Sequence, residues 1–313
     1  MSGARLRLDL ALIRGHPGLS RRRAREVIEK GQVTLDGGAV LEPGRLVDPG
    51  AAVEWDPNRK ARSRLRPPLP LLYEDEHLLV VDKPAGLLAV PTSPGADEDT
   101  VLGRLLAYER HRRPRRGYVG VVHRLDRDTS GALAFALSPA ARAGLRALFR
   151  AHRMDRRYAA LVEGVPRGEE GTIDLPIHDV YEGGRRRVAR AGEASRPART
   201  RWRVLERFPA AALLEVELET GRQHQIRLHL AEVGLPVAGD PVYRPARRRP
   251  LVEAPRQMLH ARALGFVHPV SGRKVTAESP LPADFRQALA RLRAAPAPAP
   301  SPSPRSFGPK RSR

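Results

Sequence analysis

A polar loop between two apolar segments constrains the fold more than any other feature of the sequence. Residues 123–131, HRLDRDTSG, are rich in charged and hydroxyl side chains, whereas residues 132–137 are wholly apolar and Val121 and Val122 precede the loop. The apolar flanks predict strands, and a polar loop held by rigid strands is typical of a functional site. Spacing alone leaves an alternative, a structural turn whose acids pair with the arginines of the same loop.

Strand-like and helix-like patterns interleave along the rest of this region. Residues 78–81 form a short buried-strand pattern, and Ser138 followed by Pro139 predicts the start of a helix. Residues 213–219, LLEVELE, place glutamates between apolar residues, which predicts a strand with one solvated face. This mixed order predicts an α+β domain, which we place at residues 71–293.

The first 56 residues predict a separate small α+β domain. Ser20 caps a helix in which Ala24, Val27 and Ile28 form an apolar stripe, and Gly31 ends it. Two strand-like runs follow, residues 33–35 and 39–41, separated by Asp-Gly, a pair that favours a tight hairpin. The pattern predicts a basic helix packed on a small sheet.

The order of these elements resembles the small RNA-binding module first known from a ribosomal small-subunit protein, the S-four type. The resemblance implies that the basic helix and the turn after it contact the RNA backbone. The residues that inherit this role are Arg21, Arg22, Arg23 and Lys30. The alternative is a solvated arginine face on an ordinary amphipathic helix.

Charge and composition restrict the partners and the location. The formal charge of +21 would attract a polyanion, which could be RNA, DNA or an anionic membrane, although a genome bias toward arginine would raise it too. No apolar run is long enough to span a bilayer, the N-terminus lacks a signal-peptide pattern, and cysteine is absent. We therefore expect a cytoplasmic protein with no membrane partner and no obligate protein partner.

Two segments have compositions that disfavour a packed core. Residues 57–70 are charged and proline-rich, which predicts a linker. Residues 294–313 are rich in proline, alanine, serine and basic residues, so we expect a disordered basic tail.

The loop motif HRLDRDTSG resembles the defining motif of the large-subunit ribosomal (RluA-type) pseudouridine synthases. The resemblance implies that Asp126 is the catalytic carboxylate and that Asp128 is not. Four further segments resemble that family in the same order: residues 77–92, 156–164, 218–243 and 259–269. They imply an active-site tyrosine at Tyr158, a conserved basic residue at Arg227, and a central mixed, largely antiparallel sheet.

The resemblance implies an isomerase that converts uridine to pseudouridine in RNA, most simply large-subunit ribosomal RNA, without cofactor or metal. Two alternatives are the same chemistry on transfer RNA and a catalytically silent RNA-binding or ribosome-assembly protein. Asp126 either attacks the anomeric carbon or takes the 2′ proton to give a glycal. Arg124 is expected to occupy the space left by the extruded base, and Arg127 to contact the backbone.

Three remaining features are less decisive. The family more often has threonine where this chain has Gln223, and the spacing from Thr220 to Gln223 predicts a capping box at the start of the next helix. We expect that helix to bury Ile226, Leu230 and Val233 on one stripe. Residues 181–200 are arginine-rich and are either an RNA-contacting hairpin or a solvated loop. The histidines of the last third lack the spacing of a helical metal site.

Overall fold

The computed structural model describes residues 5–59, 69–93, 96, 98–113, 117–244 and 250–294. The chain divides into two compact units, one of residues 1–68 with Ala107–Arg112 and one of residues 69–106 with 113–313. Most of the predicted linker at 57–70 lies outside the described residues, as does the predicted tail beyond Ala294. Within the described ranges, no helix is long and apolar enough to cross a membrane.

The smaller unit contains two short helices and short strands around one apolar core. Strands β2, β3 and β5 form a sheet in the order β3-β2-β5, and β1 pairs with β4. The elements are β1 (Leu6–Arg7), α1 (Leu8–Gly15), α2 (Arg21–Glu29), β2 (Val33–Leu35), β3 (Gly38–Ala39), β4 (Leu46–Val47) and β5 (Val53–Trp55). Leu8, Leu12, Val27 and Ile28 are fully buried in the core.

The predicted helix of this unit is confirmed, and the second strand is displaced. The Ser20 hydroxyl accepts a hydrogen bond from the Arg23 amide at 3.2 Å, as an N-cap does. Asp36 and Gly37 both have positive φ, so the hairpin turn has only two residues and pairs Leu35 directly with Gly38. Strand β3 therefore begins before residue 39, and Leu41, predicted to lie in a strand, is exposed.

The larger unit is built on a ten-stranded mixed sheet. Its order is β11-β14-β15-β10-β16-β9-β7-β6, with β17 beside β16 and β8 beside β9. All pairings are antiparallel except that of β16 with β9, which confirms the predicted mixed, largely antiparallel sheet. The strands are β6 (Leu71–Glu74), β7 (Leu78–Lys83), β8 (Gly120–Val121), β9 (Ser130–Ala136), β10 (Asp155–Glu163), β11 (Glu170–Asp174), β14 (Arg199–Phe208), β15 (Ala211–Leu218), β16 (Leu259–Val267) and β17 (Lys274–Glu278).

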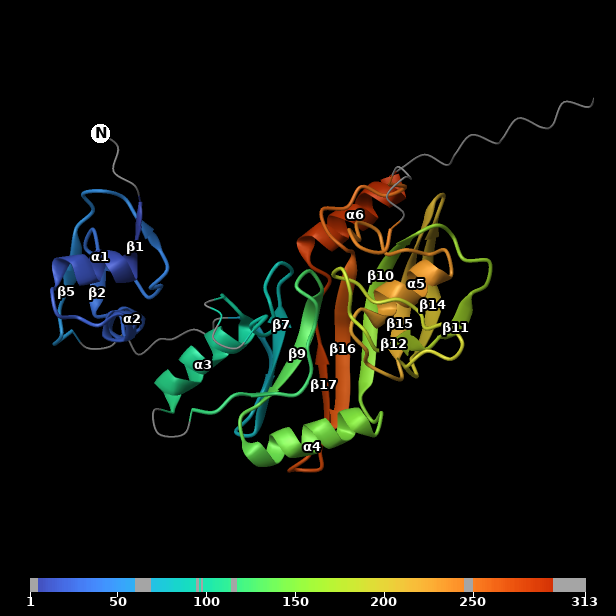
Figure 1. Ribbon diagram of the computed structural model, residues 1–313, viewed down its shortest axis with the longest axis horizontal. Coiled ribbons are helices and arrows are strands. Elements are labelled where there is room, and N and C mark those ends of the chain that lie inside the picture. The colour runs from blue at the N-terminus through green and yellow to red at the C-terminus, as the bar shows by residue number, and fades with distance from the viewer. Residues whose placement is uncertain are drawn as a thin grey trace, which may run out of the picture. The chain divides into compact units, whose positions relative to one another are not determined.

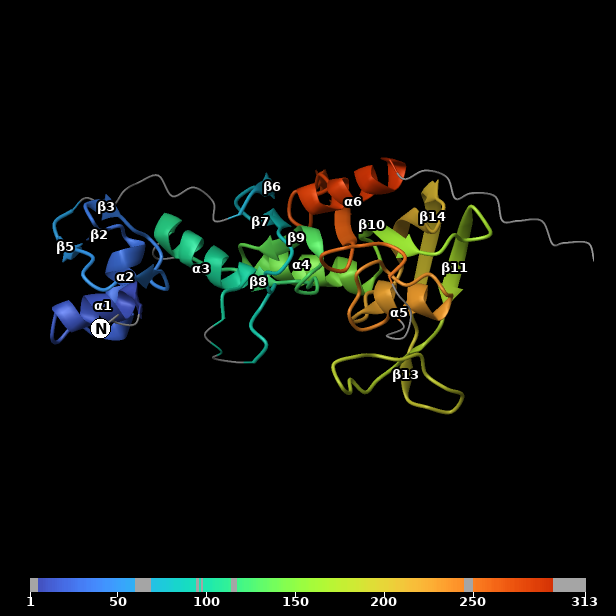
Figure 2. The same cartoon turned by 90° about the horizontal axis from the view of Figure 1, so that it is seen from above.

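Helices cover both faces of this sheet. On one face α4 (Pro139–Arg150) packs against β7, β9, β16 and β17, and α6 (Ala283–Ala294) packs against β10, β14 and β15 (Figure 1). The other face carries the largest apolar cluster, in which residues of α3 (Val101–Arg112) and α5 (Gln225–Glu232) pack against β7, β9, β10 and β15. A two-stranded sheet of β12 (Ile177–His178) and β13 (Ser195–Arg196) projects beyond α5 (Figure 2).

Two predicted surface assignments are wrong. Glu215 of β15 does not face water. It is 4% exposed, and Arg203 and Arg262 of the neighbouring strands lie 2.7 and 3.6 Å from its carboxylate. Val233 does not join the apolar stripe of α5, because the helix ends at Glu232 and Val233, 45% exposed, is its C-cap.

Candidate active site

The HRLDRDTSG loop is fixed where β9 meets its parallel partner β16. Gly131 pairs with Ala261, and its φ of +112° lies in the region that favours glycine. A Cβ on Gly131 would lie 2.2 Å from the Ala261 carbonyl oxygen, so no other residue fits this close approach of two backbones. The sequence therefore places glycine where the loop must enter the sheet.

Side chains from the segment before β16 hold the loop by several hydrogen bonds. The Arg256 guanidinium donates to the Asp128 carbonyl at 2.9 Å, and Gln257 donates to the Thr129 hydroxyl at 2.8 Å. The Ser130 hydroxyl lies 2.9 Å from His260 Nδ1, and the other nitrogen of that buried imidazole lies 3.1 Å from the Ser279 carbonyl. The loop is thus anchored on polar partners distant in sequence.

A buried lysine anchors the loop from the side of β7. Lys83 has no exposed surface, and its Nζ donates to the carbonyls of Pro84, Leu87 and Arg127 at 2.9, 2.7 and 2.7 Å. An ammonium has three donors, which these acceptors match. Burial lowers the pKa of Lys83 to about 7, against the opposing effect of the nearby carboxylates of Asp128 and Asp126.

Asp126, Arg227 and Asp240 form a chain of ion pairs beneath the loop. Arg227 donates from Nη1 to Asp126 Oδ2 at 3.0 Å, and from Nε and Nη2 to both oxygens of Asp240 at 2.6 and 2.9 Å. Arg227 and Asp240 are buried, whereas 26% of the Asp126 side chain is exposed. Although burial opposes its charge, bonding to Asp240 and Asp126 raises the pKa of Arg227.

Helix α5 begins in an unusual way that aims Arg227 at the loop. Its N-cap, His224, is a non-glycine residue in the left-handed region with φ of +60°, and its side chain does not cap the helix. The predicted capping box of Thr220 and Gln223 is wrong. The side chain of Gln225 accepts from both the Thr220 hydroxyl and the Arg222 amide at 2.8 and 2.9 Å, while Gln223 accepts from Arg186.

Tyr243 and His224 lie beside the ion pairs. Tyr243 lies with its ring 5.2 Å from the Arg227 guanidinium, and its hydroxyl is 3.0 Å from His224 Nδ1. The other imidazole nitrogen, Nε2, lies 3.9 Å from Asp126 Oδ2. Burial lowers the pKa of His224 and raises that of Tyr243 to about 12, so both side chains are uncharged near neutral pH.

Tyr158 lies on β10 beneath the same site. It is buried in the cluster that also contains Leu125 of the loop and Ile226 of α5. Burial raises the pKa of Tyr158, Arg156 opposes the rise and Asp126 adds to it, so the phenol remains neutral near pH 7. The structure thus brings Asp126, Arg227 and Tyr158, which lie far apart in sequence, to one place.

Comparison with known proteins identifies the family. The family sequence model described as RNA pseudouridylate synthase matches residues 77–232, and the S4 domain model matches residues 6–53. The chain is 40% identical over 302 residues to a ribosomal large subunit pseudouridine synthase D of Pseudomonas aeruginosa, covering 92% of each chain. The chain belongs to the RNA pseudouridylate synthase family.

Further relatives agree with this synthase in sequence and fold. A ribosomal large subunit pseudouridine synthase D of Nitrosomonas europaea is 40% identical, covering 94% of this chain and 86% of its own length. The solved structure of human RNA pseudouridylate synthase domain containing 1 has a TM-score of 0.54 at 27% identity, covering 74% of this chain and 98% of the human one. The enzyme is therefore an isomerase that acts on uridine in RNA.

The arginines predicted to bind RNA lie at the surface in different charge environments. Arg124 and Arg127 of the loop are exposed. In the smaller unit Arg21 lies 3.4 Å from Asp9, and both Arg23 and Lys30 pair with Glu26 at 2.9 and 2.6 Å. Exposed Arg22 has no ion-pair partner in the described part of the chain.

Sequence reasoning missed three residues that fix the site. Asp240 lies within a segment that resembles the family but has no predicted role, although its carboxylate accepts two of the three hydrogen bonds from Arg227. Lys83 and Arg256 were also missed. The one available signal was an acid or base directly beside a glycine or proline turn, as in Lys83-Pro84 and Gly239-Asp240.

The histidines of the last third have structural partners. His229 lies 2.9 Å from the Thr200 hydroxyl and 3.0 Å from the Leu175 carbonyl, and His268 lies 2.9 Å from Asp75. Among the described residues no group of three or more histidines and acids is arranged to hold a metal ion.

Proposed function

We propose that the chain isomerises specific uridines of large-subunit ribosomal RNA to pseudouridine, with Asp126 as the catalytic carboxylate. The observation that carries the proposal is the 3.0 Å hydrogen bond from buried Arg227 to Asp126, in a loop anchored on both sides. Two relatives that match nearly the whole chain are named for the large ribosomal subunit, which supports this RNA as the substrate.

The reaction needs four steps on one nucleotide and no external group. The N-glycosidic bond breaks, the uracil turns, a bond forms between its C5 and the anomeric carbon, and C5 loses a proton while the freed N1 gains one. Asp126 begins the reaction by attacking the anomeric carbon or by taking the 2′ proton. Both routes require an ionised, reachable carboxylate, and the 26% exposure of Asp126 leaves it reachable.

Arg227 orients the carboxylate of Asp126. Asp240 takes two of the guanidinium's donors, which fixes the group and leaves Nη1 for Asp126. A charge-assisted hydrogen bond of this kind is short and directional, so it fixes the position of the carboxylate. Arg227 is thus a positioning residue for the reacting carboxylate.

Tyr158 and two loop arginines act on the base and the RNA. The neutral phenol of Tyr158 would stack on the uracil or assist removal of the C5 proton, roles for which its burial beneath the loop is suited. Because the target is extruded from folded RNA, exposed Arg124 fills the vacated space and Arg127 contacts the backbone.

Residues 1–56 bind RNA as a separate domain and residues 71–293 carry the chemistry in this proposal. The contacting residues are Arg21, Arg22, Arg23 and Lys30. The enzyme works in the cytoplasm, where ribosomal RNA is available, and requires neither cofactor nor metal, because every step is supplied by side chains of the site.

Pseudouridine mapping tests the proposal. Ribosomal and transfer RNA from cells with the gene, without it, and with the Asp126→Asn gene restored would be compared at single-nucleotide resolution. We expect particular large-subunit sites to lose pseudouridine on deletion, to regain it with the wild-type gene, and to remain uridine with the variant.

Each other outcome changes a different part of the proposal. Loss confined to transfer RNA would overturn the substrate and keep the chemistry. Altered ribosomal subunits with every pseudouridine retained would indicate a silent assembly protein. Restoration by the Asp126→Asn gene would remove Asp126 from its catalytic role.

A further inference from the structure

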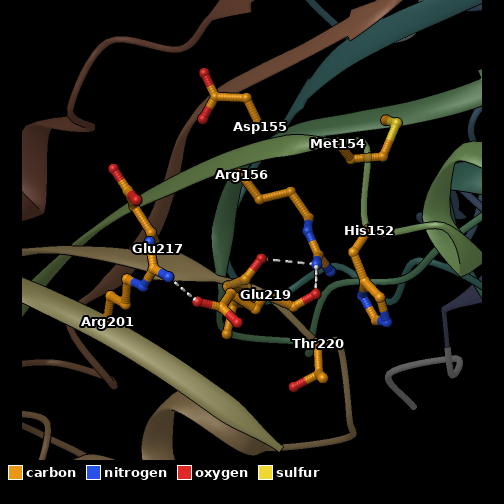
Figure 3. A pocket seen from close by; sticks show the side chains of 9 residues that line it. His152, Met154, Asp155, Arg156, Arg201, Glu217, Glu219 and Thr220 are labelled. Carbon is orange, nitrogen blue, oxygen red and sulfur yellow. Dashed lines mark hydrogen bonds and ion pairs between the residues drawn. The ribbon is translucent and has the colours of Figure 1, made fainter. Parts of the chain in front are cut away.

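A cavity of about 420 Å³ opens beside the first residues of β10, the strand that contains Tyr158 (Figure 3). It lies between the turn after α4, the first residues of β10, and the ends of β14 and β15. Its lining comprises His152, Met154, Asp155, Arg156, Arg201, Glu217, Leu218, Glu219 and Thr220. None of these residues has a part in the proposed chemistry.

Arg156 contributes a buried positive charge without a carboxylate partner to this cavity. The residue is 7% exposed, and its Nη2 donates only to the carbonyls of Leu218 and Glu219 at 2.8 and 3.1 Å. The buried Nε has no hydrogen-bond partner, and within the described ranges no acid pairs with the guanidinium. A buried charge without a counter-ion is costly, which favours binding of an anion here.

The other charges of the lining balance one another or face solvent. Arg201 pairs with Glu219 at 2.5 Å, and Asp155 lies 3.5 Å from Arg157, outside the lining. Glu217 is exposed, so water screens its charge. The guanidinium of Arg156 is therefore the buried charge that the lining leaves uncompensated.

Backbone geometry makes room for this guanidinium beside the site. A Cβ on Gly221 would lie 2.6 Å from Arg156 Nη1, so glycine there keeps the space free. Arg156 precedes Tyr158 by two residues on β10, and its charge opposes the rise in the pKa of Tyr158 that burial causes, so the two side chains lie near each other. The cavity is thus next to the place where the proposed function puts the target base.

We propose that this cavity binds a phosphate of the RNA backbone adjacent to the target uridine, with Arg156 as the ligand of its oxygens. The proposal rests on the function proposed above and adds a binding site to it. A phosphate held there would fix the register of the strand, and hence which nucleotide enters the site. Arg156 Nη1, which forms no hydrogen bond within the described residues, is the donor left for it, since Nε is buried and Nη2 donates to two carbonyls.

Removing single phosphate charges from the substrate tests the proposal. Short RNA stem-loops carrying the mapped target would each contain one neutral methylphosphonate near the target. Single-turnover pseudouridine formation and RNA affinity would be measured for the wild-type enzyme, Arg156→Gln and Arg156→Lys, with circular dichroism melts of each. Arg201→Gln is the matched control, because Arg201 lines the same cavity and is paired with Glu219.

We expect one methylphosphonate position to reduce wild-type affinity roughly ten- to a hundredfold, the cost of one charged hydrogen-bonded contact. The affinity of Arg156→Gln for normal RNA should fall by a similar factor, and the methylphosphonate at that position should lower it no further. Arg156→Lys should bind more tightly than Arg156→Gln. Arg201→Gln should respond to the methylphosphonate as the wild type does. An Arg156→Gln enzyme that remains as sensitive to every position as the wild type would overturn the proposal, as would a wild-type enzyme insensitive to all of them.

The variant Glu217→Gln tests whether the group bound in the cavity is a phosphate or a base. The substitution removes a negative charge near the site, so we expect tighter binding of normal RNA by a few-fold. A base bound jointly by Arg156 and Glu217 would instead bind more weakly after this change, and that result would also overturn the proposal. Pseudouridine formation by the wild-type enzyme on normal RNA tests the proposed function separately, so the two failures are distinguishable.

Discussion

Arg227 distinguishes two carboxylates that look alike in the sequence. Asp240 is fully buried, accepts two hydrogen bonds from the guanidinium, and also accepts from the amides of Val242 and Tyr243. Asp126 accepts one hydrogen bond and remains partly exposed. The Asp240 carboxylate thus has four hydrogen bonds, whereas Asp126 keeps acceptor capacity for a substrate, as the proposed function requires.

Asp126→Asn should abolish most activity and preserve the fold. Asparagine is nearly isosteric, and Arg227 keeps its two bonds to Asp240, so we expect a loss of unfolding free energy of only about 1 kcal/mol. Single-turnover pseudouridine formation should fall by about a thousandfold or more, because the group that begins bond cleavage is gone. Circular dichroism melts and RNA affinity would be measured alongside.

Asp128→Asn is the matched control for that experiment. Within the described part of the chain the Asp128 side chain forms no hydrogen bond or ion pair, and its carbonyl alone is held by Arg256. The variant should keep most of its activity. Near-normal turnover with Asp126→Asn, or an equal loss in both variants with lowered melting temperatures, would make HRLDRDTSG a structural turn.

The sequence could predict the members of the site and not its supports. HRLDRDTSG and the segment containing Arg227 single out residues that the fold brings within 3.0 Å. Asp240 and Lys83 act through contacts that depend on the fold, Lys83 reaching a carbonyl 44 positions away. An acid or a lysine near a turn does not indicate which distant residue it contacts. The roles of Asp240 and Lys83 could therefore be found only from the structure.

At the scale of elements, a single lysine joins the turn after β7 to the loop before β9. Lys83→Met keeps the length of the side chain and removes the donors, leaving the carbonyls of Pro84, Leu87 and Arg127 without this partner. We expect a loss of about 2 to 4 kcal/mol in unfolding free energy, because buried carbonyls then lack hydrogen bonds. Urea unfolding would measure it, and an unchanged midpoint would show that the anchor is dispensable.

The pairing of β9 with β16 depends on glycine in a similar way. Gly131→Ala would drive a methyl group into the Ala261 carbonyl, so we expect a loss above about 3 kcal/mol or failure to fold. Gly184→Ala is the control, since Gly184 also has positive φ but has open space around it, and should cost about 1 kcal/mol. Thermal melts with equal shifts for the two variants would contradict this steric argument.

The sequence predicts where helices and strands lie better than it predicts which side chains they contact. The strand at residues 78–81 and the helix capped by Ser138 depend on local patterns, and both are present. The alternating pattern of the strand predicts that Glu215 is solvated. In the structure Arg203 and Arg262 form ion pairs with its carboxylate, and the residue is buried. Such a pairing of neighbouring strands is not encoded within one strand, so periodicity alone predicted an exposure that Glu217 has and Glu215 lacks.

At the scale of the whole molecule, the basic charge is distributed over parts with different environments. Many arginines of the larger unit are paired, as Arg207 is with Glu169 and Arg196 with Asp179. The total of 56 lysines and arginines therefore overstates the number of cations free to meet phosphate. The sequence gives the total, whereas only the structure separates compensated from uncompensated charge.

Deleting residues 1–56 should weaken RNA binding and flatten its salt dependence while some isomerase activity remains. This segment has its own apolar core and carries Arg21, Arg22, Arg23 and Lys30 on or beside one helix. Each lost phosphate contact should reduce the magnitude of the slope of log affinity against log salt by roughly 0.7 to 0.9. Titrations of RNA binding at several salt concentrations, with melts of the shortened chain, would measure the change.

Single substitutions in the intact chain test the same expectation without removing a domain. Exposed Arg22 lacks an ion-pair partner in the described part of the chain, so Arg22→Gln should lower the slope by roughly 0.7 to 0.9. Arg23 is paired with Glu26, so Arg23→Gln should change it less. An unchanged slope in both the shortened chain and Arg22→Gln would mean that the basic helix is only a solvated face, and that RNA is held by the larger unit alone.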